Sequence, residues 1–265
     1  MCFDLVSYAM GMANGTGGGG GSTNVLSGTA APASELGSNG NIYLQYSQLP
    51  ADYTHLEYIQ SNGSQYIDTH YIPTVYTTVA LKLNPQVIQD SAIFGSEWAL
   101  NGFFLMFYDA KFRWHSSDAA NSATITENMD YTVKADVSGF DVNGTPYAST
   151  EGAPVARPIR IFSTTVPGGG SSSNRKGSFK LYYFSAYESG RLMLCMVPVK
   201  RNSDNALGMY DILGGEFYGN GGTGDFTAGP EQAYTYAPTV SAYAKVGGTW
   251  QELVGTDIND INLGS

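Results

Sequence analysis

The sequence has few charged residues, few cysteines and no long apolar run. Charged residues make up 14% of the 265 residues, and 13 Lys and Arg against 23 Asp and Glu give a formal net charge of −10. So few cations argue against a surface that binds the phosphates of DNA or RNA. No apolar run approaches the length that spans a bilayer. We therefore expect neither nucleic acid nor a membrane as a partner.

Motifs for metal binding and catalysis are scarce as well. Cys2 and Cys195 cannot form a zinc site by themselves, and the three histidines stand apart without a His or Cys partner at ligand spacing. No Gly-x-Ser-x-Gly elbow is present to hold a nucleophilic serine. The glycine-rich run 219–224 lacks the Lys-Ser/Thr ending of a phosphate loop, so it indicates a tight turn. We expect no metal, no cofactor and no enzymatic activity.

Tyrosine, phenylalanine and glycine are abundant. The chain has 19 Tyr, 12 Phe and 33 Gly, a mixture that suits half-buried strands joined by tight turns. Short apolar or alternating runs are bounded by Gly, Pro, Asn and Asp, while helical periodicity is almost absent. So many short strands predict an all-β sandwich of two sheets. The clearest candidate strands are 57–60, 77–83, 103–108, 131–137, 177–188 and 192–199.

Residues 1–24 form a separate segment by composition. Residues 3–13 predict a short helix, which would be only marginally stable alone in water. The run of glycines from Gly17 to Gly21 that comes after it is a flexible tether. This pattern fits an apolar plug that docks onto a neighbouring subunit, and a frayed terminus fits about equally well. The segment lacks the cationic start of a secretory signal. Its candidate anchoring residues are Phe3, Leu5, Val6, Tyr8 and Met10.

Two short segments flank the middle of the chain. Residues 25–48 contain an Asn39-Gly40 turn and a strand near 42–46, and residues 231–265 contain a hairpin that turns at Gly247-Gly248. Each is too short to bury a core alone, because a lone hairpin is marginal in water. We predict that they pair into one small discontinuous β module, with residues 49–230 inserted as a larger domain.

Several phrases resemble known families. The flanking segments resemble a short module that recurs in phage tail, head-fibre and other virion proteins. The middle resembles concanavalin A-like or laminin G-like jelly-roll domains of phages and gut bacteria, with the matching phrases in the expected order. Those phrases are Leu49–Thr69, Gly177–Phe184, Met196–Lys200, Gly208–Ile212 and Phe217–Asn220.

The resemblance implies a bacteriophage virion structural protein of the fibre, decoration or adhesion type. Such a protein is made in the bacterial host cytoplasm and carried on the virion surface. Its N-terminal segment would contact other virion proteins of the capsid or tail, it is expected to be a homo-oligomer, and its jelly roll would contact glycans of the host surface or of mucus. The alternative is a purely structural capsid or tail decoration protein that binds no glycan.

Glycan recognition needs aromatic faces and a few placed polar groups. One stretch of the middle domain offers both, and its candidate ligand-binding residues are Trp98, Asn101, Tyr108, Arg113 and Trp114. The competing interpretation is that the tryptophans fill the sandwich core, because large aromatic residues in strands are more often buried. A glycoside hydrolase, the activity of some jelly-roll relatives, needs two carboxylates that flank the sugar bond, whereas the acids here are scattered singly.

Overall fold

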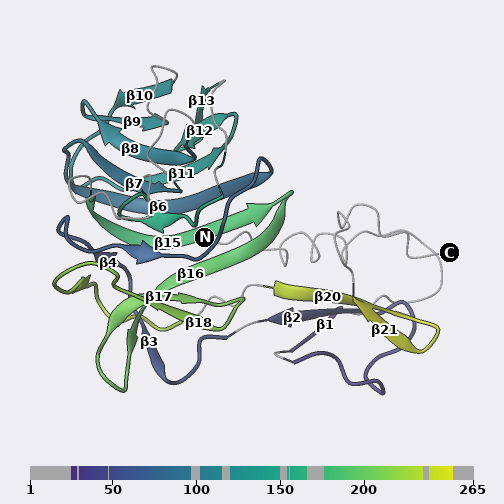
Figure 1. Cartoon of the computed structure of the whole chain (residues 1–265). Coiled ribbons are helices and arrows are strands. Elements are labelled where there is room, and N and C mark those ends of the chain that lie inside the picture. The colour runs from purple at the N-terminus through teal and green to yellow at the C-terminus, as the bar shows by residue number, and fades with distance from the viewer. Residues whose placement is uncertain are drawn as a thin grey trace. The chain divides into compact units, whose positions relative to one another are not determined.

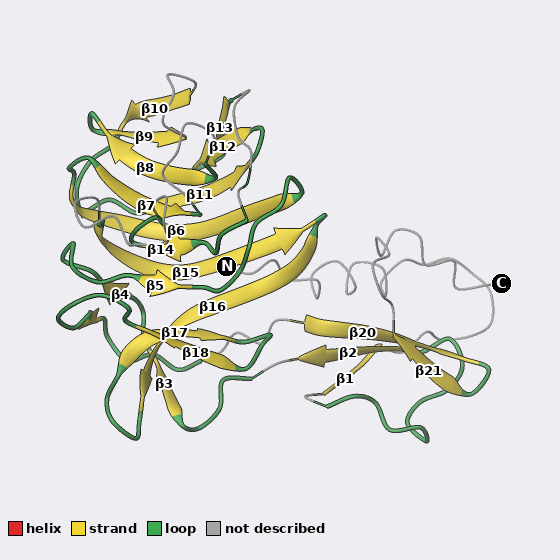
Figure 2. Ribbon diagram, in the orientation of Figure 1, coloured by secondary structure: helices red, strands yellow, loops and turns green. Residues whose placement is uncertain are grey.

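The computed structural model describes residues 25–28, 30–46, 48–96, 102–114, 120–149, 154, 156–165, 176–234 and 239–252. Every regular element in these ranges is a β-strand (Figures 1 and 2). The same ranges contain no helix long and apolar enough to cross a membrane. The predicted helix 3–13 and its anchoring residues lie outside the described residues.

The chain divides into two compact units. The smaller unit combines residues 1–49 with residues 235–265, and the larger unit comprises Pro50–Tyr234. Strands of one unit pair only with strands of the same unit in the described ranges. The prediction of an all-β jelly-roll sandwich with a small β module is confirmed.

The smaller unit is a four-stranded sheet built from both flanks of the chain. β1 pairs in parallel with β2, and the hairpin β20–β21 adds to the other edge of β2 through antiparallel pairing. The sheet buries Tyr43, whose ring packs against Tyr243 and Trp250 at centroid distances of 6.3 and 5.8 Å. In spatial order the strands are β1 (Val25–Gly28), β2 (Ile42–Tyr46), β20 (Thr239–Val246) and β21 (Thr249–Glu252).

A buried lysine holds the loop between β1 and β2. Lys245 is 6% exposed, and its Nζ donates hydrogen bonds to the carbonyl oxygens of Ser34, Leu36 and Gly37 at 2.8, 2.6 and 3.1 Å. Its ammonium also lies 5.6 Å from the ring centroid of Trp250. Burying an ammonium costs free energy unless its N–H groups find hydrogen-bond acceptors. The three carbonyl oxygens offset that cost and hold the loop in place.

The larger unit contains two antiparallel sheets. The smaller of them has six strands and carries most of the aromatic core residues of the first half of the domain. In spatial order its strands are β10 (Ala120–Thr124), β9 (Lys111–Trp114), β8 (Phe104–Tyr108), β7 (Ser91–Gly95), β14 (Arg160–Ile161) and β5 (Ile67–Asp68).

The second sheet has eleven strands. Its main path is β13 (Thr145–Ala148), β12 (Gly139–Val142), β11 (Tyr131–Asp136), β6 (Thr77–Val87), β15 (Ser178–Glu188), β16 (Arg191–Arg201), β17 (Leu207–Asp211) and β18 (Glu216–Gly219). The short strands β3 (Tyr53–His55), β4 (Ile59–Gln60) and β19 (Thr227–Ala228) join it beside β16, β15 and β4 respectively.

Aromatic side chains join the two sheets. Phe94 of the six-stranded sheet lies 5.9 Å from Phe184 of the eleven-stranded sheet, measured between ring centroids, and Phe107 lies 6.0 Å from Phe179. Both pairs are edge-to-face, an arrangement that adds to the free energy gained by burying their area. These contacts run through a single core cluster, so each sheet turns one face inward and the other outward.

We expect Phe184→Ala to lower the free energy of unfolding by about 3–5 kcal/mol, because it leaves a cavity where the two sheets meet. Urea denaturation followed by circular dichroism measures this change. Val87→Ala is the control, since Val87 is 46% exposed at the end of β6, and its effect should stay within about 0.5 kcal/mol. Equal losses from both variants would show that the aromatic contact does not join the sheets as described.

Candidate functional site

The outer face of the six-stranded sheet is defined by the alternation along β8. Leu105 and Phe107 belong to the core cluster between the sheets. Successive strand residues point to opposite faces, so Phe104, Met106 and Tyr108 point outward. Of these three, Phe104 and Met106 are buried, whereas Tyr108 is 39% exposed. This outer face therefore presents an accessible aromatic ring at the end of β8.

β9 places a cation beside that ring. Phe112 and Trp114 point into the core, so Arg113 between them points outward, and its cross-strand partner is Met106. The guanidinium carbon of Arg113 lies 4.4 Å from the centroid of the Tyr108 ring. The contact is a cation–π interaction, which orients both side chains. Tyr108 and Arg113, separated by a turn in sequence, thus form one patch, in which Tyr108 is the exposed member and Arg113 is only 8% exposed.

The other predicted ligand-binding residues have different positions. Trp114 is fully buried, and its ring lies 5.0 Å from that of Phe103 in an edge-to-face contact. A buried ring offers no free face to a sugar, so Trp114 fills the core, which was the competing interpretation. Trp98 and Asn101 lie outside the described residues.

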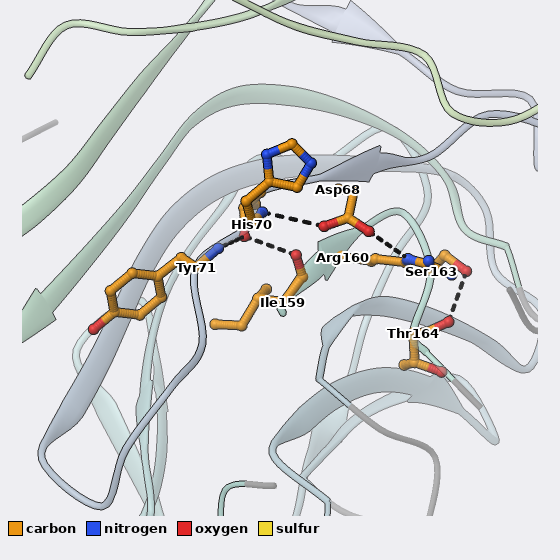
Figure 3. A network of polar contacts seen from close by, with 8 residues as sticks. Asp68, His70, Tyr71, Ile159, Arg160, Ser163 and Thr164 are labelled. Atoms are coloured by element: carbon orange, nitrogen blue, oxygen red, sulfur yellow. Dashed lines mark hydrogen bonds and ion pairs between the residues drawn. The ribbon is translucent and has the colours of Figure 1, made fainter. Parts of the chain in front are cut away.

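The opposite end of the same outer face carries an ion pair that the sequence did not indicate. Arg160 on β14 pairs across the strands with Asp68 on β5 and with Gly95 on β7, so all three share the outer face. Arg160 Nε donates to Asp68 Oδ2 at 3.0 Å (Figure 3). The guanidinium also stacks over the ring of Tyr66, with 4.9 Å from its carbon to the ring centroid.

A left-handed residue comes directly after β14 and redirects the chain. Phe162 has a φ of +64°, rare for a bulky residue, and its ring stacks on Phe179 in the core at 4.3 Å. The turn breaks the simple alternation of the strand. Thr164 then lies over Gly95, because its Cγ2 is 2.9 Å from the position that a Cβ on Gly95 would take. Ser163 donates to the Thr164 carbonyl at 3.3 Å (Figure 3).

A surface groove lies elsewhere, where the β16–β17 turn approaches the loop after β18. Phe217 there is flanked by Tyr53, stacked at 5.7 Å, and by the guanidinium of Arg201 at 4.6 Å, so neighbours already occupy its ring faces. The groove therefore offers charge rather than a free aromatic face. Its polar and aromatic lining includes Arg201, Asp204, Asn205, Phe217, Asn220 and Asp225.

The groove contains two carboxylates, and one of them is held as an anion. Arg201 Nε and Nη2 donate to the two oxygens of Asp204 at 3.0 and 2.6 Å, and the backbone N–H of Ala206 adds a third bond. The hydrogen bonds from Arg201, supported by that N–H, lower the pKa of Asp204 to about 2. A general acid of a glycosidase needs a raised pKa, so Asp204 is unsuited to that role.

The part of the chain that the structure describes contains no group of three or more His, Cys, Asp or Glu side chains arranged to hold a metal ion.

Arg160, Asp68 and Thr164 were not predicted as site residues. The sequence signal was slight, an arginine shortly before Ser-Thr-Thr, and only the register of β14 with β7 and β5 brings Arg160 to Asp68 and Gly95.

No protein-family model matches this chain, and no curated protein matches it. Among solved structures, the native heptameric SAP-like pentraxin from Limulus polyphemus matches with 12% sequence identity and a TM-score of 0.41, covering 71% of this chain and 100% of that one. The fold given above rests on the strands and sheets of this chain itself.

We expect Arg201→Gln to raise the pKa of Asp204 from about 2 toward its ordinary 3.8, because the main partner of the carboxylate is removed. Carboxyl-carbon NMR over a pH titration measures the change. Lys200→Gln is the matched control, since Lys200 pairs with Glu231 instead, and it should leave the Asp204 titration unchanged. An Asp204 pKa that stays near 2 in Arg201→Gln would contradict the stated cause.

Proposed function

We propose that this chain is a non-enzymatic structural protein of a bacteriophage particle, and that its jelly roll binds glycans of the host surface or of mucus. The binding surface is the outer face of the six-stranded sheet. The observation that carries the proposal is the exposed ring of Tyr108 held against the guanidinium of Arg113.

The chemistry of sugars fits this patch. A sugar ring has an apolar face of C–H groups, which packs on an aromatic ring, and a rim of hydroxyl groups, which need polar partners. The ring of Tyr108 supplies the first and its phenol supplies the second, while Arg113, which is only 8% exposed, holds the ring in place. One such contact is weak, but display in many copies on a particle, as a homo-oligomer, converts weak contacts into useful avidity.

Attachment to the particle is assigned to the chain's flanks. The four-stranded sheet combines β1 and β2 with β20 and β21, from segments that resemble a recurrent module of phage virion proteins. In this proposal, that module and the N-terminal residues Phe3 to Met10 contact other virion proteins of the capsid or tail. The protein is made in the host cytoplasm and carried on the virion surface.

The second candidate is a decoration protein that binds no glycan. It is favoured by the burial of Phe104 and Met106, which leaves Tyr108 as the accessible aromatic ring of β8. A hydrolase is the less favoured third candidate, because Asp204, one of the two groove carboxylates, is held ionised by Arg201.

We expect the full chain, displayed as a multimer on beads, to retain mucin or bacterial surface polysaccharide. Tyr108→Ala should reduce the retained fraction roughly three- to tenfold, the loss expected for one aromatic stacking contact. Tyr76→Ala is the matched control, because Tyr76 is 68% exposed but precedes β6 of the other sheet, and it should bind as the unmodified chain does.

Three other outcomes are informative. No retention on any polysaccharide by the multimer would leave the decoration protein as the function. Equal losses of the retained fraction in Tyr108→Ala and Tyr76→Ala would show that the binding surface is not at β8. Release of new reducing ends during incubation would establish a hydrolase instead.

We also expect peptides of this chain in mass spectra of purified phage particles from the host that produces it. Their amount relative to the major capsid protein should stay constant through successive density-gradient steps, because a virion component cannot be washed away. A chain that is present in the lysate but lost from the gradient-purified particles would contradict the virion assignment.

A further inference from the structure

The outer face of the eleven-stranded sheet carries aromatic and charged side chains around Tyr182. β15 lies between β6 and β4 at this point (Figure 1), and its core residue Leu181 pairs across the strands with Leu83 and Ile59. Side chains alternate along a strand, so the residues next to these three point outward. The outward residues are Tyr58 directly before β4, Lys180 and Tyr182 of β15, and Lys82 and Asn84 of β6.

Two tyrosine rings meet edge to face in this group. The rings of Tyr58 and Tyr182 lie 5.7 Å apart between centroids, with 67° between their planes. A lysine lies over each ring, because Lys180 Nζ is 4.6 Å from the centroid of Tyr58 and Lys82 Nζ is 4.4 Å from that of Tyr182. These cation–π contacts hold the rings in place. Both tyrosines are only half-buried, so this Tyr58–Tyr182 corner is accessible from solvent.

A carboxylate and an ammonium lie beside the corner. Oδ1 of Asp130 accepts hydrogen bonds from the Tyr182 hydroxyl and from Asn84 Nδ2, at 3.0 and 2.8 Å. Its Oδ2 lies 2.7 Å from Lys82 Nζ, and the side chains of Lys82 and Asp130 are 35% and 44% exposed. Gln86 bonds the amide oxygen of Asn84 at 2.7 Å, which orients that amide. The two charged groups are therefore held in position and open to solvent.

The carboxylate stays ionised. Burial acts to raise the pKa of Asp130, but hydrogen bonds from Lys82, Asn84 and Tyr182 outweigh it and lower the pKa below its ordinary value. A carboxylate has about four acceptor positions, and these three bonds leave about one of them free. A free acceptor next to an ammonium, which has three N–H donors, suits a ligand whose hydroxyl groups both donate and accept.

The charges around the corner balance. Lys82 is paired with Asp130, whereas Lys180 has no carboxylate within ion-pair distance among the described residues. Glu57 is also near, because the pKa of Tyr182 is raised mainly by burial, then by Asp130 and by the charge of Glu57. Two cations thus accompany two carboxylates. The local field therefore favours neither an anion nor a cation as the ligand.

We propose that the Tyr58–Tyr182 corner is a second glycan-binding site, which takes a neutral sugar unit with two adjacent hydroxyl groups. One hydroxyl donates to Asp130 and its neighbour accepts from Lys82, while the C–H face of the sugar packs on the tyrosine rings. The inference rests on the proposed glycan binding and adds to it a site on the other sheet. Two sites on one domain raise the avidity of each displayed copy.

NMR titration of the full chain, labelled isotopically on its tyrosine rings, locates the bound sugar. The probes are maltohexaose and mannohexaose, which are neutral, and trigalacturonate, which is acidic. Single Tyr→Phe variants at Tyr58, Tyr182 and Tyr108 assign the three signals. At least one neutral probe should shift the signals of Tyr58 and Tyr182 at millimolar concentration, and it should bind there more tightly than trigalacturonate.

Two variants test the roles of the residues. Asp130→Asn keeps the shape of the side chain and should weaken binding at the corner about tenfold or more, the loss of a hydrogen bond to a charged group. Tyr58→Ala should weaken it roughly three- to tenfold. Lys134→Gln is the control for charge, because exposed Lys134 on β11 shares the outer face but pairs with Ala80 outside the group. It should leave the affinity unchanged.

Stability separates binding from a structural role of the same network. Asp130→Asn should change the melting temperature by less than about 4 °C, because exposed ion pairs contribute little. A large fall in melting temperature with an unchanged affinity would show that the network only stabilises the sheet, and would overturn the site.

The tyrosine signals distinguish failure of this site from failure of the proposed function. Shifts at Tyr58 and Tyr182, with or without a shift at Tyr108, support the second site. A shift at Tyr108 alone would overturn the second site and leave the proposed function standing. No shift at any of the three with any probe would count against both. Tighter binding of trigalacturonate than of both neutral probes at the corner would overturn the neutral ligand class.

Discussion

Edge-to-face packing of aromatic rings between the two sheets is the interaction on which the larger unit depends. Phe94 with Phe184 and Phe107 with Phe179 bridge the layers, and the core cluster continues around them. Side chains alternate along a strand, so the residues before and after each inward-pointing ring point to the outer face. The core thereby decides which polar residues reach the outer face.

The consequence is clearest on the six-stranded sheet. Tyr108 and Arg113 reach the outer face because Phe107, Phe112 and Trp114 point inward. At the other end, Arg160 reaches it because Ile161 packs in the core, and the left-handed Phe162 carries the chain round to Thr164. Two polar regions thus share one face. Each region holds an arginine in contact with an aromatic ring, Arg113 with Tyr108 and Arg160 with Tyr66.

Strand boundaries show where sequence patterns succeed and where they stop. The candidate strand 177–188 is closely matched by β15, whose long aromatic run is hard to place except in a packed sheet. The candidate 77–83 ends too early, because β6 continues to Val87 through Pro85, at a point where its register with β15 shifts. β13 contains Pro146 and was not predicted. As an edge strand it leaves one side unpaired, where a missing N–H is tolerated.

The sequence by itself determined the all-β class and the two-layer sandwich, because composition and a period of two residues are local properties. It also placed Tyr108 and Arg113 in one candidate site, since a single hairpin joins β8 and β9. Only the tertiary structure decided that Trp114 is core and that Arg160 meets Asp68, 92 residues away in sequence. Which strands become neighbours depends on long-range pairing, and no local pattern carries that information.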